Sequence, residues 1–137
     1  MAVLLVSMLA TTGCSDVLLR NDHRISITSP QSDATVGVPL TVTWTTKDFT
    51  APRDGSFAVF LDRDPQPPGQ TLDQFGGRPF DIFRVDRPQI TLRDVVPHQA
   101  ADALERNQHD VTVILLDRSG RRIGESQAFV QFNVKGS

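Results

Sequence analysis

Two aspartates and three histidines are the residues of this chain whose chemistry suits a metal ion. Asp62 and Asp64 lie two apart where an apolar run ends, and carboxylate oxygens are ligands that Ca²⁺ prefers. Aspartates are equally common as turn-forming residues at strand ends. The histidines, His23, His98 and His109, form no His-x-His or His-x₃-His pair, so a zinc or copper site would require the fold to bring them together. The sequence therefore predicts no metal ligand set and no cofactor.

The sequence also lacks the pattern of a catalytic site. Ser119 and Ser126 have neither the glycine-flanked turn of a nucleophile elbow nor a histidine close in sequence. Asp102 and Glu105 are spaced as a solvated pair on a helical turn. The 14 Lys and Arg residues nearly balance the 16 Asp and Glu residues and are interspersed with them, which excludes a basic nucleic-acid footprint. We therefore expect no enzyme and no nucleic-acid partner.

Cys14, the only cysteine, follows an apolar run over residues 3–10. That run has the length of a signal-peptide hydrophobic region and is shorter than the roughly 20 residues that span a bilayer. The small residues that lead into Gly13-Cys14-Ser15 resemble the lipobox of bacterial lipoproteins. The resemblance implies that Cys14 is lipidated and anchors the protein in the cell membrane on its extracytoplasmic side. An uncleaved anchor, a secretory signal and a buried N-terminal strand are the alternatives.

This interpretation divides the chain into three parts. Residues 1–13 are the predicted signal peptide, and residues 14–23 are the lipidated cysteine and a tether. Residues 24–137 are the predicted domain. A domain of this size can bury a sufficient core without a disulfide or a structural metal.

Short apolar runs alternate with polar residues throughout the predicted domain and are separated by Gly, Pro, Asp and Asn. The predicted strands are residues 24–28, 38–45, 56–61, 80–85, 89–95, 111–116 and 127–134. Helical composition is confined to residues 99–105, enough for a turn or two. About seven short strands with almost no helix indicate an all-β fold, a single antiparallel sandwich.

Three segments resemble the immunoglobulin-like and fibronectin type III-like modules of bacterial envelope proteins. They are the opening residues 25–30, the strand around Val42-Thr43-Trp44, and the closing hairpin. The resemblance implies an immunoglobulin-like sandwich with Trp44 packed at its centre. It implies no function, because one fold hosts many functions.

The alternation of the strands leaves a surplus of apolar residues. Phe60, Ile114, Leu116 and Phe129 are all expected on the outer face of one sheet, because the inner positions beside them are already apolar. An exposed apolar patch of this size usually marks an interface. We predict a partner-binding surface at these four residues; the alternative is that residues 74–83 cover them.

Together these features predict a non-catalytic, lipid-anchored interaction module outside the cytoplasm. It would act as an envelope accessory protein or as a small subunit of a membrane-bound complex, with a protein partner in the cell envelope. The alternative is a ligand-binding module for a metal ion or a carbohydrate that uses the loop over residues 62–79.

Overall fold

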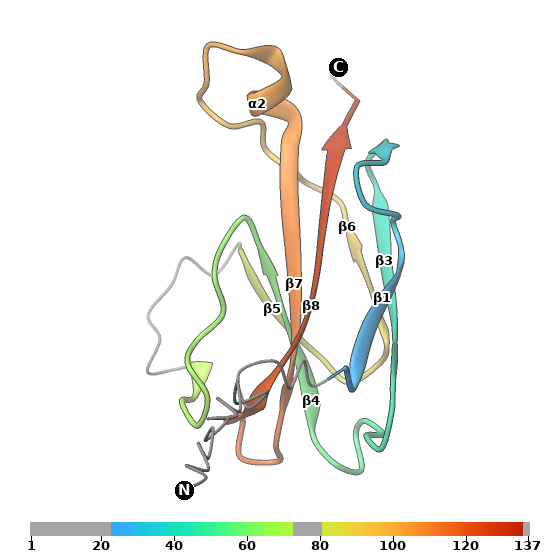
Figure 1. The fold of residues 1–137 in the computed structure, drawn as a ribbon, viewed down its shortest axis with the longest axis vertical. Helices are drawn as coiled ribbons and strands as arrows, with labels where there is room; N and C mark the ends of the chain where they lie inside the picture. The colour runs from blue at the N-terminus through green and yellow to red at the C-terminus, as the bar shows by residue number, and fades with distance from the viewer. Residues whose placement is uncertain (1–22, 73–80, 136–137) are drawn as a thin grey trace, which may run out of the picture.

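The computed structural model describes residues 23–72 and 81–135, which form two β-sheets packed face to face (Figure 1). The three-stranded sheet has the order β1 (Ile25–Ser29), β3 (Leu40–Thr46), β6 (Gln89–Leu92). The five-stranded sheet has the order β2 (Thr35–Val36), β8 (Arg122–Val134), β7 (Gln108–Leu116), β4 (Ser56–Leu61), β5 (Ile82–Val85). Every strand pair is antiparallel except β2 with β8.

This strand order is that of an immunoglobulin-like sandwich. β1, β3 and β6 correspond to strands A, B and E of that fold, and β4, β7 and β8 to strands C, F and G. The predicted all-β sandwich is therefore confirmed. The helical turn expected within residues 99–105 is present but lies later, as α2 (Ala103–Asn107), and the Asp102 carboxylate caps it by accepting the Leu104 amide at 2.6 Å. The two-residue strand β2 was not predicted.

The core between the sheets follows from the alternation of β3 and β4. Leu40, Val42 and Trp44 of β3 are buried, and the threonines between them are not. The Trp44 ring packs edge-on against Phe57 of β4 with ring centroids 5.2 Å apart, which is a favourable aromatic geometry. Trp44 thus lies in the central core, as the resemblance implied. Val38 lies before β3 and is 44% exposed, so it does not extend the inner row.

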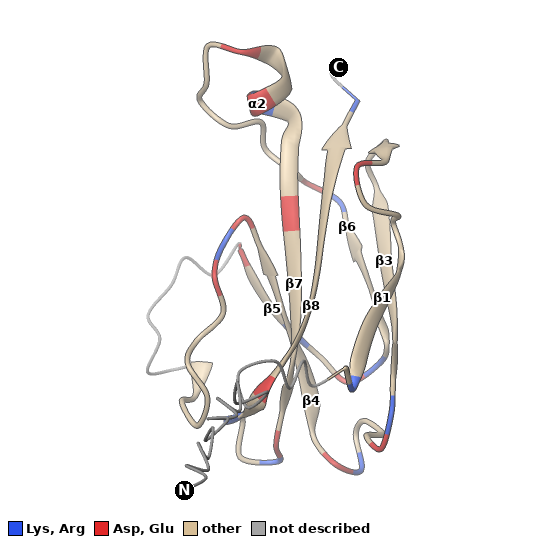
Figure 2. Ribbon diagram, viewed as in Figure 1, with Lys and Arg blue, Asp and Glu red and all other residues tan. Residues whose placement is uncertain are grey.

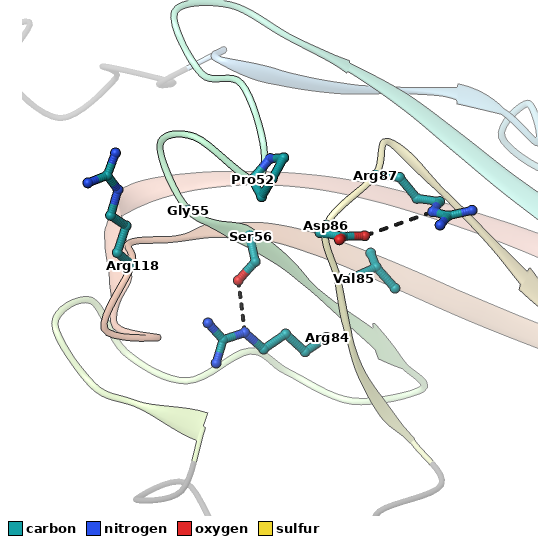
Figure 3. Close-up of a pocket in the computed structure, with 8 residues that line it drawn as sticks. All are labelled: Pro52, Gly55, Ser56, Arg84, Val85, Asp86, Arg87 and Arg118. Carbon is teal, nitrogen blue, oxygen red and sulfur yellow. Dashed lines mark hydrogen bonds and ion pairs between the residues drawn. The ribbon is translucent and has the colours of Figure 1, made fainter.

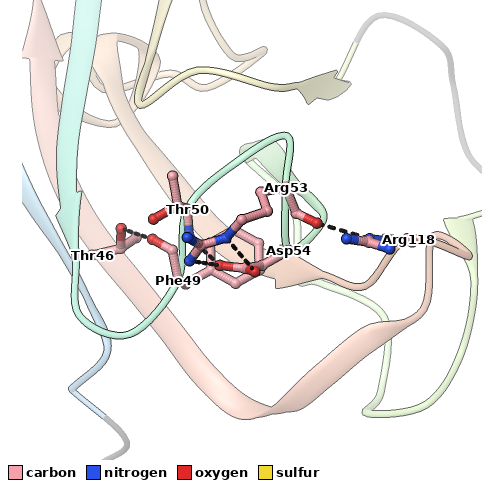
Figure 4. A network of polar contacts seen from close by, with 6 residues as sticks. All are labelled: Thr46, Phe49, Thr50, Arg53, Asp54 and Arg118. Carbon is pink, nitrogen blue, oxygen red and sulfur yellow. Dashed lines mark hydrogen bonds and ion pairs between the residues drawn. The ribbon is translucent and has the colours of Figure 1, made fainter.

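One end of the sandwich, which we call the base, consists of Arg24 and the loops over residues 47–55, 86–88 and 117–121. These segments lie together because β1 and β8 begin there while β3 and β7 end there. In Figure 4, the Asp54 carboxylate accepts hydrogen bonds from the Thr50 amide at 2.7 Å and from Arg53 Nε at 3.0 Å. Arg118 Nε donates to the Arg53 carbonyl at 2.8 Å and so joins the β7–β8 turn to this loop. The hydrogen bond from Arg53 is the main reason that the pKa of Asp54 is lowered.

The outer face of the five-stranded sheet differs from the prediction. Phe60, Ile114 and Leu116 are fully buried in a second apolar cluster, against which Leu72 and Ile82 pack. The prediction that they form an exposed patch is therefore wrong, although the alternation had placed them on the correct face. Phe129, the fourth member, is 57% exposed. Most of the predicted cover, residues 74–80 of 74–83, lies outside the described residues, and Ile82 of the remainder belongs to β5.

Arg122 fastens residues 66–72 to the sheet, and we call them the covering segment because Leu72 packs against the second apolar cluster. Its buried guanidinium donates to the Gln66 carbonyl at 2.7 Å and to Gln127 Oε1 at 3.0 Å. Its backbone bonds both to the Gln70 carbonyl and to the Gly69 amide at 3.0 Å. Burial lowers the pKa of Arg122, and the carbonyl groups around it replace lost water. These contacts hold residues 66–70 against the start of β8.

We expect Arg122→Ala to lower the free energy of unfolding by about 2–3 kcal/mol, because it removes charge-assisted hydrogen bonds and leaves a buried carbonyl without a donor. Urea unfolding measures this loss. The neighbouring Arg121 is exposed, and its side chain donates to the Gly69 carbonyl at 3.0 Å, so Arg121→Ala is expected to cost no more than about 0.5 kcal/mol. Equal losses in the two variants would contradict the role of Arg122.

The predicted signal peptide and most of the tether, with Cys14, lie outside the described residues, so their roles stay predictions. Within residues 23–72 and 81–135, no helix is both long enough and apolar enough to cross a membrane.

Candidate functional site

Strand pairing brings Asp62 beside the start of β7. Leu61, the last residue of β4, pairs with Val111 of β7. Because the strands are antiparallel, Asp62, which follows Leu61, lies opposite Asp110, which precedes Val111. The Asp62 amide donates to the Asp110 carbonyl at 2.9 Å. The Asp110 amide in turn donates to Asp62 Oδ1 at 2.9 Å. The Asp62 carboxylate is thereby fixed in orientation at the end of the sheet.

The second oxygen of this carboxylate faces two histidines. Asp62 Oδ2 lies 2.7 Å from His109 Nδ1 and 3.6 Å from His98 Nε2. The two imidazole rings lie 4.7 Å apart, centroid to centroid, with an interplanar angle of 30°. One potential ligand atom from each residue lies within 4.8 Å of the others. We call these three residues the Asp–His–His cluster.

Burial differs across the cluster. The His109 side chain is 1% exposed, whereas those of Asp62 and His98 are 21% and 43% exposed. The Nε2 atom of His109 is buried and has no hydrogen-bond partner in the described structure. Asp62 has a φ of 53°, in the left-handed region, which aspartate tolerates better than most residues. The cluster therefore has one closed side, at His109, and one side open to solvent.

His98 reaches the cluster from a loop held by α2. The His98 amide donates to the Arg106 carbonyl, in the last turn of α2, at 2.9 Å. Since α2 runs directly into β7, this bond ties the loop to the strand that carries His109. We call this end of the sandwich the tip; it consists of residues 62–64, residues 93–107 and the start of β7, and it lies opposite the base (Figure 1).

Negative charge accumulates around the cluster. Partial burial raises the pKa of Asp110, and the nearby carboxylates of Asp62 and Asp64 raise it further. A surface trough of about 790 Å³ adjoins the cluster and includes Asp62 and His98 in its lining, together with Asp81, Asp94 and Arg93. Such surroundings favour a cation over an anion.

A second depression lies at the base, with a volume of about 550 Å³ (Figure 3). Three arginines, Arg84, Arg87 and Arg118, contribute to its lining. Arg84 Nε donates to Ser56 Oγ at 2.9 Å, and Arg87 Nε lies 3.8 Å from the Asp86 carboxylate. The two ends of the sandwich thus carry depressions of opposite character, with arginines at the base and carboxylates at the tip.

The chain is similar to a solved structure described as "Structures of Clostridium thermocellum CbhA fibronectin(III)-like modules". The two are 14% identical with a TM-score of 0.49, and the match covers 81% of this chain and 95% of that one. No protein-family model matches the chain, and no curated protein matches it significantly. The assignment of the fold therefore rests on the order of the strands, and function must be argued from this chain's own residues.

The structure groups some of the residues that the sequence singled out and separates others. Asp62, considered with Asp64 as a possible pair of Ca²⁺ ligands and as a turn residue, contacts His98 and His109. His23 precedes β1 and lies at the base. Register between β4 and β7 was the missing information, because Asp62 and His109 become neighbours only once those two strands are paired.

Proposed function

We propose that this chain is a non-catalytic interaction domain, held at the extracytoplasmic face of the cell membrane by a lipid on Cys14. It serves as an envelope accessory protein or as a small subunit of a membrane-bound complex. The cluster at the tip offers imidazole and carboxylate groups, which are common ligands of metal ions and hydrogen-bond partners for polar groups of a binding partner.

The observation that carries the proposal is the position of the start of β1. The described chain enters the sandwich at the base, where the Lys47 amide donates to the Arg24 carbonyl at 2.8 Å. A tether that ends at this point would hold the base toward the membrane and the tip away from it. The Asp–His–His cluster would then face outward, toward a neighbouring protein or a soluble ligand.

The charge of the base supports this orientation. Acidic and basic residues mix in its loops (Figure 2), but six basic residues outnumber four acidic ones. The basic residues are Arg24, Lys47, Arg53, Arg87, Arg118 and Arg121, and the acidic residues are Asp48, Asp54, Asp86 and Asp117. A net positive surface is attracted to any anionic headgroups in the leaflet that it faces.

Anchoring gives such a domain its advantage as a binding module. One acyl chain gives only marginal membrane attachment, whereas two or more give stable residence. A domain confined to the membrane surface meets neighbouring membrane proteins at high effective concentration. Phe129, exposed on the outer face of β8, is the remaining residue of the predicted partner-binding set that such a neighbour can reach.

We expect Cys14→Ser to release the protein from membranes when the full chain is expressed in a bacterium, because the substituted residue cannot carry the lipid. The change should move most of the protein from the membrane pellet to the soluble fraction, measured by immunoblotting after ultracentrifugation. Ser7→Ala, which leaves the cysteine intact, is the matched control and should stay in the pellet.

A detergent pull-down from the same membranes tests whether a partner protein is bound. Wild-type protein should retain a stoichiometric membrane protein that Cys14→Ser recovers in much smaller amount. Equal membrane fractions for the wild type and Cys14→Ser would contradict the proposed anchor. Recovery of the wild type without any partner would contradict the interaction role.

A further inference from the structure

We propose that Asp62, His98 and His109 form a binding site for Zn²⁺ at the tip of the sandwich. Each residue supplies one ligand atom: Asp62 Oδ2, His98 Nε2 and His109 Nδ1. A fourth position, open to the adjoining trough, remains for water or for a group from a binding partner. This inference does not depend on the lipid anchor, since all three residues belong to the folded domain.

The distances between the ligand atoms fit this metal. Zinc binds imidazole nitrogen at about 2.0–2.1 Å and carboxylate oxygen at about 2.0–2.2 Å, so ligand atoms of a tetrahedral site lie about 3.3 Å apart. Asp62 Oδ2 lies 3.6 Å from His98 Nε2 and 2.7 Å from His109 Nδ1. The first separation is about 0.3 Å longer than the tetrahedral value, and the second must widen by about 0.6 Å. The third pair, His98 with His109, has potential ligand atoms within 4.8 Å of each other, so small side-chain movements bring the three atoms to a shared ion.

The widening is accompanied by a change at His109. In its neutral form the ring donates a hydrogen from Nδ1 to Asp62, because an ionised carboxylate is only an acceptor. Zinc takes the Nδ1 lone pair, and the ring stays neutral by carrying its hydrogen on Nε2. That nitrogen is buried and has no partner in the described structure, so the change of tautomer replaces an unpaired buried acceptor with an unpaired buried donor, two states of comparable desolvation cost.

The cluster is also positioned in advance. Asp62 Oδ1 is held by the Asp110 amide, which leaves Oδ2 directed at the histidines. The His98 backbone is held by the Arg106 carbonyl. Such outer contacts orient ligand side chains and raise metal affinity. The excess of carboxylates around the cluster adds a favourable field for a divalent cation.

The chemistry of the donor set selects zinc over calcium. Ca²⁺ takes six to eight oxygen ligands, whereas this cluster offers two imidazole nitrogens and one carboxylate. Three protein ligands with an open fourth position are the arrangement of zinc sites that also bind an exogenous group. The domain would therefore capture a ligand or a partner side chain through the metal.

The test is calorimetric titration of the full chain carrying Cys14→Ser, which removes both the lipid and a competing thiol. With ZnCl₂ we expect saturable binding of one ion per chain, and with CaCl₂ at least about tenfold weaker binding. His98→Ala and Asp62→Asn in the same background should each weaken zinc binding by about tenfold or more. His23→Ala, which removes the histidine at the base, should bind as the parent does.

Two further readouts separate a lost ligand from a lost fold. His98 is 43% exposed, so His98→Ala should melt close to the parent temperature without zinc and should lose the zinc-induced rise in Tm. Nitrogen chemical shifts of the His109 ring should report the move of its hydrogen from Nδ1 to Nε2 on zinc addition. Absence of saturable zinc binding would overturn the proposal, as would wild-type affinity in both His98→Ala and Asp62→Asn.

Discussion

Phe60→Ala is expected to lower the free energy of unfolding by about 3–5 kcal/mol, the usual cost of deleting a fully buried aromatic ring. Phe60 is 0% exposed and packs with Ala58, Ile114 and Leu116 beneath the covering segment. The cavity left by the ring can collapse only partly, because the neighbours Leu72 and Ile82 cannot move freely into it. Ile82 is held by the pairing of β5 with β4, and Leu72 by the bridge between Thr71 and Arg121. Chemical denaturation of the domain measures the loss.

Phe129→Ala is the matched control, since it removes the same ring from the same face of the same sheet. Phe129 is 57% exposed, and we expect a loss of no more than about 0.5 kcal/mol. Phe129→Asp should likewise keep its melting temperature while it weakens capture of the membrane partner. Similar losses of stability for Phe60→Ala and Phe129→Ala would contradict the burial of one and the exposure of the other.

Gly55→Ala is expected to lower the free energy of unfolding by about 3 kcal/mol or more. Gly55 has a φ of 152°, and a Cβ atom there would lie 1.9 Å from the Leu116 carbonyl oxygen. Backbone strain of this kind costs about 1–3 kcal/mol, and overpacking adds about 1–3 kcal/mol. The variant forces apart β4 and β7, which carry Asp62 and His109 at their other ends.

Gly37→Ala provides the comparison, because a Cβ atom at Gly37 meets no atom within 4 Å. We expect its thermal unfolding to stay within a few degrees of the wild type. A Gly55→Ala protein that melts as Gly37→Ala does would show that the close approach to Leu116 is absent.

The alternation of apolar and polar residues predicted the strands well, because the core requires apolar residues on the inward face of each strand. The period of two places Leu40, Val42 and Trp44 inward. The same period placed Phe129 outward, and the structure confirms its exposure. Strand boundaries were less accurate at β7, which begins at Gln108 rather than at Val111. The three additional residues are polar or charged, so hydrophobic periodicity alone does not include them in the strand.

The covered outer face could not be predicted from alternation, which assigns a face but not what lies above it. Arg122 and Gln66 matter here, because the hydrogen bond from Arg122 to the Gln66 carbonyl holds the chain that follows β4 against the start of β8. A buried arginine and a buried glutamine carry no apolar pattern in the sequence. Their contact also joins segments more than fifty residues apart.

The Asp–His–His cluster was hidden for a related reason. Metal sites are found from sequence when their ligands are close together and regularly spaced. Here Asp62 and His109 are 47 residues apart and meet through the pairing of β4 with β7. His98 joins them through a loop fixed by a hydrogen bond to α2. The three-dimensional convergence, and not spacing, identifies the candidate site.

The intact mass of the mature protein, purified from native membranes in a mild detergent, tests the lipid anchor on Cys14 most directly. We predict a polypeptide that begins at Cys14 and carries the added mass of a diacylglycerol group, with or without a further acyl chain. A mature protein that begins upstream of Cys14 and carries no lipid mass would contradict the membrane-anchored interaction domain proposed here.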